Sequence, residues 1–172
     1  MEQWIITSYF EQLAKDFKAI SHTKDGINRF SILDEDSIAE EIRGSLDFSS
    51  WCLLLEKAPT KVKANESDVL HEYRTFRFTI CRDVSRLGAT DKLLIFEEAE
   101  LIAKKIFTRI LKDHRKARRT NITSFPLFDL VHQLDLENFE DILNGDIIGT
   151  DAKITIKNPF NENSYYTESE WN

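Results

Sequence analysis

Hydrophobic and polar positions alternate along this chain with two different periods, and each period predicts one kind of element. Between Gln3 and Ile20, apolar residues recur every three or four positions, the spacing that gathers side chains on one face of a helix. The same spacing runs from about Asp91 to His114 and predicts the longest helix, with Thr90 as its N-cap. Because its apolar stripe is broad, we expect this helix to lie across a sheet.

Alternation of apolar and polar residues predicts the strands of that sheet. It is clearest from Tyr73 to Val84 and recurs from Ile147 to Lys157. Asn28 to Leu33 can form a short strand, and the apolar run of Ser50 to Glu56 is typical of a central one. The spacing of apolar residues from Ser124 to Leu136 predicts another strand.

The remaining segments are polar. Lys57 to Asp68 reads as a loop, Asp34 to about Ser45 as a short helix, and Glu137 to Leu143 as an acidic turn or helix before a turn at Asn144-Gly145. We therefore predict an α+β fold, a mainly antiparallel β-sheet of about four to five strands with the N-terminal and long central helices packed on one face. Residues 1–160 would form a single domain, and residues 161–172 a polar, aromatic C-terminal tail.

The composition agrees with one folded domain. The chain has 172 residues, of which 41% are hydrophobic and twelve are Phe. Its apolar runs are far shorter than the roughly 20 residues of a membrane helix. The first twenty residues carry scattered charges, unlike a secretory signal. We expect a soluble protein that is not secreted and has no membrane partner.

Motifs for catalysis or for cofactor binding are missing from the sequence. The four histidines fall in no metal-ligand spacing and read as surface or boundary residues, and the glycine-rich phosphate-binding motifs are absent. Cys52 and Cys81 lie in hydrophobic runs and read as reduced core residues. Asp151 and Lys153 have the spacing of a restriction-type nuclease, but that chemistry needs a metal-binding acid on a paired strand. We expect no cofactor, no metal and no enzymatic activity.

The charge is unevenly distributed. The net charge is −7, yet the segment Lys104–Arg119 holds eight basic residues against Asp113 alone, about +7, which leaves −14 for the rest. The end of this segment is a candidate contact for a partner subunit or for the DNA backbone: Arg109, Lys112, Arg115, Lys116, Arg118 and Arg119. A solvated helix end explains the same run, since cations there stabilise the helix dipole by roughly 0.3–1 kcal/mol. The acidic segments Asp34–Asp47 and Asp135–Asp146 of a neighbouring copy would complement it.

The C-terminal tail is the second candidate contact. Its aromatic residues stand among polar ones after a proline: Phe160, Tyr165, Tyr166 and Trp171. Such a segment is either disordered or an arm that docks on an adjacent subunit, because interfaces favour Tyr and Trp.

The order of elements resembles a known family, the tail-terminator or tail-completion (head–tail connector, neck) proteins of tailed bacteriophages. The likeness rests on the helix Trp4–Ile20, the strand pair Trp51–Glu56 and Tyr73–Val84, the long helix, and the closing hairpin that ends at Lys153–Phe160. It implies a virion structural protein, assembled in the bacterial host cytoplasm, that forms a homo-oligomeric ring and binds neighbouring neck, portal or tail proteins. Any contact with DNA would not be sequence-specific.

A second function fits the acidic body and small size of the chain. An immunity- or antitoxin-type protein neutralises a basic toxin in a tight one-to-one complex.

Overall fold

Two helices and a six-stranded mixed sheet make up the described part of the protein. The computed structural model describes residues 2–23, 25–33, 44–57, 60–64, 70–85, 89–127, 129–140 and 146–159. Along the chain the elements are α1 (Glu2–Asp16), β1 (Phe30–Leu33), β2 (Cys52–Lys57), β3 (Lys61–Ala64), β4 (Leu70–Asp83), α3 (Ala89–Arg119), β5 (Asp135–Glu140) and β6 (Ile147–Pro159). Neither helix is long and apolar enough to cross a membrane.

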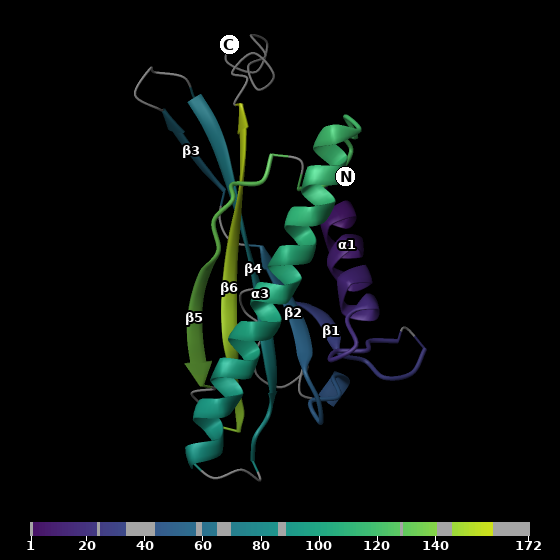
Figure 1. The fold of residues 1–172 in the computed structure, drawn as a ribbon, viewed down its shortest axis with the longest axis vertical. Helices are drawn as coiled ribbons and strands as arrows, with labels where there is room; N and C mark the ends of the chain where they lie inside the picture. Colours follow the sequence, from purple (N-terminus) through teal and green to yellow (C-terminus); the bar gives the residue numbers. More distant parts are fainter. Residues whose placement is uncertain are drawn as a thin grey trace, which may run out of the picture.

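The long antiparallel pair of β4 and β6 forms the centre of the sheet. Their register runs from His71 opposite Pro159 to Asp83 opposite Ile147. The strand order is β1-β2-β4-β6-β5, and β3 pairs with β4 beyond the end of β2. Only β1 and β2 are parallel among the described pairs, so the sheet is mixed. Figure 1 shows α3 lying obliquely across this centre.

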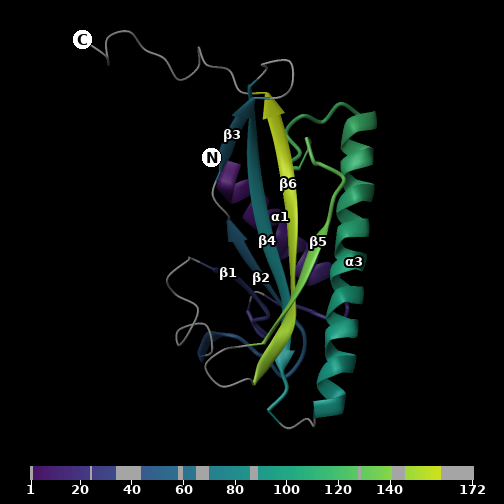
Figure 2. The same ribbon diagram turned by 90° about the vertical axis from the view of Figure 1, so that its left-hand side faces the viewer.

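Both helices cover the same face of the sheet, as predicted. One core cluster joins buried residues of α1 and α3 to the inward side chains of the strands. Phe10 of α1 packs against Phe78 of β4 with ring centroids 5.6 Å apart, and both side chains are fully buried. Figure 2 shows α3 along one side of the long strands. The α+β class is confirmed, and its core lies between helices and sheet.

The opposite face of the sheet carries a smaller apolar cluster and a polar strip. The cluster consists of Leu33, Leu46, Cys52, Leu54 and Cys81. In the strip, Arg77 of β4 lies between Glu56 of β2, at 3.1 Å, and Asp151 of β6, at 3.8 Å. Much of this face is therefore occupied by contacts between side chains of neighbouring strands.

The predicted count of four to five strands is wrong, because two edge strands were read as other structures. Residues 61–64 were expected in a loop but form β3, which continues along β4. Residues 137–143 were expected as a turn or helix, but Asp135–Glu140 form β5 against β6. Edge strands are mostly solvated, so they lack the apolar alternation of central strands.

The strand expected from Ser124 to Leu136 is also absent from the described residues, apart from the start of β5. This segment makes one isolated bridge, Leu130 to Ile156. The backbone turns repeatedly instead, with Leu130 N–H donating to Leu127 O at 3.2 Å, and Pro126 has no N–H for a ladder. Leu127 and Leu130 are buried because this loop folds onto the core.

Some predictions lie outside the described residues. They are the turn at Asn144-Gly145, nearly all of the helix from Asp34 to Ser45, and the C-terminal tail 161–172 together with Phe160 just before it. The helix boundaries also differ from the prediction. α3 begins earlier and ends later than expected, at Ala89 and Arg119, whereas α1 ends at Asp16, before a turn in which Ser21 adopts a φ of 51°.

Candidate interaction surfaces

Four of the six basic candidates lie together at the C-terminal end of α3. Lys112, Arg115, Lys116 and Arg119 are exposed and, with Thr120, line a shallow depression of about 350 Å³. Their spacing of three and four residues places them on one side of the helix. We call these four residues the basic end.

The fifth candidate, Arg109, is exposed but bonds to side chains of its own chain. Its Nε donates to Asp113 Oδ2 at 2.9 Å, and the Tyr9 hydroxyl donates to the same oxygen at 3.0 Å. Burial raises the pKa of Tyr9, and the Asp113 carboxylate raises it further, so this hydroxyl remains a donor. The hydrogen bond to Asp113 also raises the pKa of Arg109. Arg109 thus belongs to a network that joins α3 to α1.

The sixth candidate, Arg118, lies 3.6 Å from Asp129 beside a second depression. Its lining residues are His114, Arg118, Asp129, Leu130, Val131, His132 and Lys157.

Two histidines that the sequence treats as separate meet in this second depression. His132 Nε2 lies 3.2 Å from His114 Nδ1, and their rings pack edge to face. The loop after α3 brings them together, because Val131 N–H donates to Thr155 O of β6 at 2.8 Å. Nothing in their spacing signals this fold-back. Among the described residues no third His, Cys, Asp or Glu completes a metal-binding group with them.

A second surface was missed by the sequence analysis. Leu93, Leu94 and Leu101 of α3 are 65%, 57% and 51% exposed, on the side away from the sheet. Leu94 and Leu101 are seven residues apart, two helical turns, which places them on one line along the helix. This spacing is visible in the sequence, but the apolar residues of the same helix that face the core are more numerous and define the predicted apolar side.

An acidic strand lies at one edge of the sheet. β5 pairs only with β6 among the described strands and carries Asp135, Glu137 and Glu140, all exposed. Glu137 pairs with Lys153 of β6 at 3.2 Å, and Glu140 pairs with Lys92 of α3. We call these three carboxylates the acidic edge. Together with Asp146, they are the described acidic residues of the segment Asp135–Asp146, which was predicted to complement the basic end.

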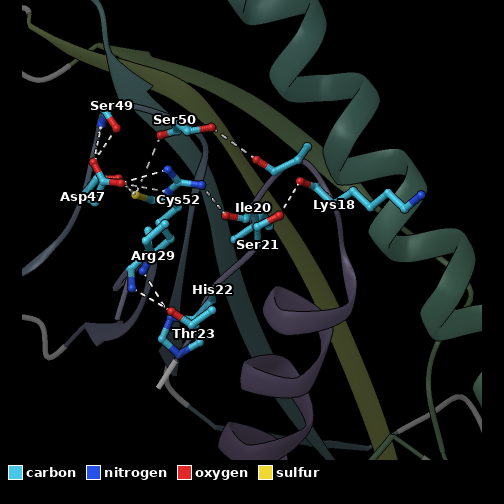
Figure 3. A network of polar contacts seen from close by, with 12 residues as sticks. Lys18, Ile20, Ser21, His22, Thr23, Arg29, Asp47, Ser49, Ser50 and Cys52 are labelled. Carbon is cyan, nitrogen blue, oxygen red and sulfur yellow. Dashed lines mark hydrogen bonds and ion pairs between the residues drawn. The ribbon is translucent and has the colours of Figure 1, made fainter. Parts of the chain in front are cut away.

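In the other acidic candidate segment, Asp34–Asp47, Asp47 is the acidic residue that the structure describes. Its carboxylate joins two segments of the chain. Asp47 Oδ2 accepts from Arg29 Nη2 at 2.8 Å, and its Oδ1 accepts from the Ser49 hydroxyl (Figure 3). These hydrogen bonds lower the pKa of the Asp47 carboxyl, and the bond from Ser49 has the larger effect. Arg29 also donates to Ile20 O at 2.9 Å. This clasp ties the chain after α1 to the loop that leads into β2.

The nuclease-like pair is also engaged in the sheet. Asp151 accepts a hydrogen bond from Thr79 at 2.5 Å and lies 3.8 Å from Arg77, while Lys153 pairs with Glu137. The Arg77 guanidinium therefore lies between the carboxylates of Asp151 and Glu56.

Known proteins offer no further guide to these surfaces. The chain matches no protein-family model, and no characterised protein matches its sequence.

Proposed function

We propose that this protein is a structural subunit of a phage neck or tail-terminator ring, which assembles through contacts with its own copies and with neighbouring neck, portal or tail proteins. The proposal joins the resemblance in element order to the surfaces described above.

One observation carries the proposal: two surfaces of opposite charge lie at different places on one molecule. The basic end projects from the last turns of α3, whereas the acidic edge runs along β5 at the sheet margin (Figure 1). A contact between two different surfaces is heterologous, and repeated copies of it form a ring when the rotation closes. Opposite charges also favour the correct pairing over like-charged alternatives.

The sheet itself supports such assembly. β1, β3 and β5 each pair with a single neighbour among the described strands, and an unpaired strand edge offers backbone donors and acceptors to another molecule. The charged residues of β5 would direct that edge toward a basic partner surface. The same basic end could lie against DNA phosphates in the lumen of a ring, without reading sequence.

Charge reversal on each surface tests the heterologous contact. We expect Lys112→Glu/Lys116→Glu and Glu137→Lys/Glu140→Lys each to reduce the assembled mass, because each places like charges across the contact. An equimolar mixture of the two variants should assemble again, because the reversed surfaces complement each other. Lys61→Glu/Lys63→Glu, on exposed positions of β3, is the control with the same change of charge.

Native mass spectrometry or light scattering gives the result. Full-length assembly of both variants separately, or failure of the mixture to assemble when both variants are folded, would contradict this contact. A tight one-to-one complex with a basic toxin by an otherwise monomeric protein would instead favour an immunity-type function.

A further inference from the structure

The side of α3 that faces away from the sheet is exposed from Leu94 to Thr108. Every position on this side is accessible, from Leu94 through Leu101 to Thr108. The buried residues Ala99, Ile102 and Ile106 lie on the opposite side, against the sheet. A helix in a globular protein normally turns its polar side outward, so exposed leucines at this place indicate a contact with another macromolecule.

The charges around the central leucine change sign along the helix. Glu97 and Glu98 are exposed one turn before Leu101, and Lys104 and Lys105 are exposed one turn after it. Lys104 pairs with Glu100 of its own helix at 2.9 Å. Within the described part of the chain, no ion pair engages Glu97, Glu98 or Lys105.

We propose that this face binds α3 of a second copy, antiparallel, about a two-fold axis at Leu101. Two-fold symmetry requires the surface to complement itself, so a residue before the axis must suit a residue equally far beyond it. Glu97 then faces Lys105 of the second copy, and Glu98 faces Lys104. Both pairings join opposite charges, and each occurs twice. A parallel pair would instead place glutamates against glutamates.

The apolar residues fit the same register. Leu101 meets its own copy at the axis, and Leu94 lies opposite Thr108 of the second copy. The centre is therefore apolar and is surrounded by ion pairs, the arrangement in which a central contact residue carries most of the binding energy. A contact limited to one pair of helices falls below the roughly 1,200–2,000 Å² of standard interfaces, so the dimer should be concentration-dependent.

This contact goes beyond the proposed ring and shares with its surfaces only the outermost position, Lys112. In the antiparallel register, Lys112 lies opposite residue 90 of the second copy, at the very end of the paired region, whereas Arg115, Lys116 and Arg119 extend beyond the start of the partner helix at Ala89. The acidic edge belongs to β5. Failure of the helix pair and failure of the ring contact are therefore distinguishable by the variants that cause them.

Engineered cysteines test the axis directly. Under mild oxidation we expect Leu101→Cys to form a disulfide-linked dimer, because both copies of residue 101 lie at the axis. Leu94→Cys alone should link poorly, whereas a mixture of Leu94→Cys and Thr108→Cys should link. The native Cys52 and Cys81 are fully buried and should not contribute. Equal linking of Leu94→Cys and Leu101→Cys would overturn the antiparallel register, and no linking of Leu101→Cys would overturn the contact.

Substitutions at the same positions test the energetics. Leu101→Glu should raise the dissociation constant of the dimer by at least roughly 30-fold, the effect of a central contact residue. Ile122→Glu, at a side chain that is 47% exposed elsewhere, is the matched control and should leave it unchanged. Glu97→Lys/Glu98→Lys and Lys104→Glu/Lys105→Glu should each stay monomeric but form a heterodimer when mixed. Sedimentation equilibrium measures these masses, with circular dichroism to verify folding, and self-association of a folded Leu101→Glu variant as tight as the parent would overturn the proposal.

Discussion

At the scale of single residues, the thiols of Cys52 and Cys81 lie directly opposite each other on β2 and β4. Both cysteines are free and fully buried. Burial raises the pKa of Cys52 to about 12 and holds the pKa of Cys81 well above its usual value. Since only the thiolate reacts as a nucleophile, both side chains should be inert in the folded protein.

We therefore expect neither thiol to react with a disulfide reagent in the native protein at about pH 8, where an exposed cysteine reacts readily. In denaturant both should react. Absorbance of the released thiolate counts the modified cysteines in each state. Rapid modification of either cysteine without denaturant would show that the apolar cluster around them opens.

His22 is a buried histidine held in its neutral form. Its Nδ1 accepts the Arg29 N–H at 3.2 Å (Figure 3), and its Nε2 lies 3.8 Å from Glu11. Burial lowers the pKa of His22, with Lys15 acting in the same direction and Glu11 opposing it. The unfolded chain then binds a proton more readily than the folded one, so stability is full above the unfolded pKa of about 6.5 and is lost as the pH falls below it.

The substitution His22→Asn should weaken this pH dependence. Asn keeps a short side-chain acceptor for the Arg29 N–H but does not titrate. Between about pH 7 and pH 5, the free energy of unfolding should fall less steeply for the variant than for the parent. The other histidines are common to both proteins and cancel in the comparison. Identical slopes in denaturant titrations would show that His22 has the same pKa folded and unfolded.

At the scale of elements, the pairing of β4 with β6 depends on close contact of their backbones at Gly149. Gly149 lies opposite Cys81, and a Cβ added at Gly149 would overlap Ile80 O and lie 2.8 Å from Cys81 Cα. These are backbone atoms of a central strand, which cannot move aside as a flexible side chain could.

Gly149→Ala should therefore lower the free energy of unfolding by about 2 kcal/mol or more, toward the upper range for overpacked cores. Gly44→Ala is the matched control, since a Cβ there meets nothing within 4 Å. We expect the control to change stability by less than about 0.5 kcal/mol. Chemical denaturation compares the two, and an equal effect at both positions would show that β6 shifts freely against β4.

The long elements were predictable because their burial is one-sided. Phe76, Phe78 and Ile80 face the core in alternation, and Ile95, Ala99 and Ile102 follow the helical period. The strand prediction around Leu127 and Leu130 was wrong because these leucines are buried by a loop that folds onto the core. β5 escaped prediction because Leu136 and Phe139 pack on opposite faces of the sheet, three residues apart.

The candidate surfaces were partly predictable. The basic end can be identified from the sequence, because Lys112, Arg115 and Lys116 are three or four residues apart and so lie on one side of a helix. The four-residue spacing of Arg109 and Asp113 on one helix indicates their ion pair, but nothing in the sequence shows that Tyr9, 104 residues from Asp113, joins them. Contacts of such long sequence separation follow from the packing of whole elements.

At the scale of the whole molecule, the residues that the structure describes offer three candidate surfaces for partners: the basic end, the acidic edge of β5 and the outer face of α3. In the assembly that we propose, the first two pair with each other between copies, and the third pairs with its own copy. These surfaces are the basis of the proposal that the protein works by assembly with its own copies and with other proteins.

Surface charge makes that assembly sensitive to salt. The Debye length is about 10 Å at 0.1 M ionic strength and about 3 Å at 1 M, so the contact between the basic end and the acidic edge should weaken at high salt. The helix pair has an apolar centre and should weaken less. Assemblies of many copies would then dissociate toward dimers as salt is raised.

The most direct test of the central claim is the mass of the full-length protein in solution, measured by light scattering over a range of protein and salt concentrations, alone and mixed with candidate neck, portal or tail proteins. We expect a mass of several chains at low salt that falls toward two chains at high salt, or incorporation into a stable complex with such a partner. The mass of a single chain under all these conditions, with no complex formed, would contradict it.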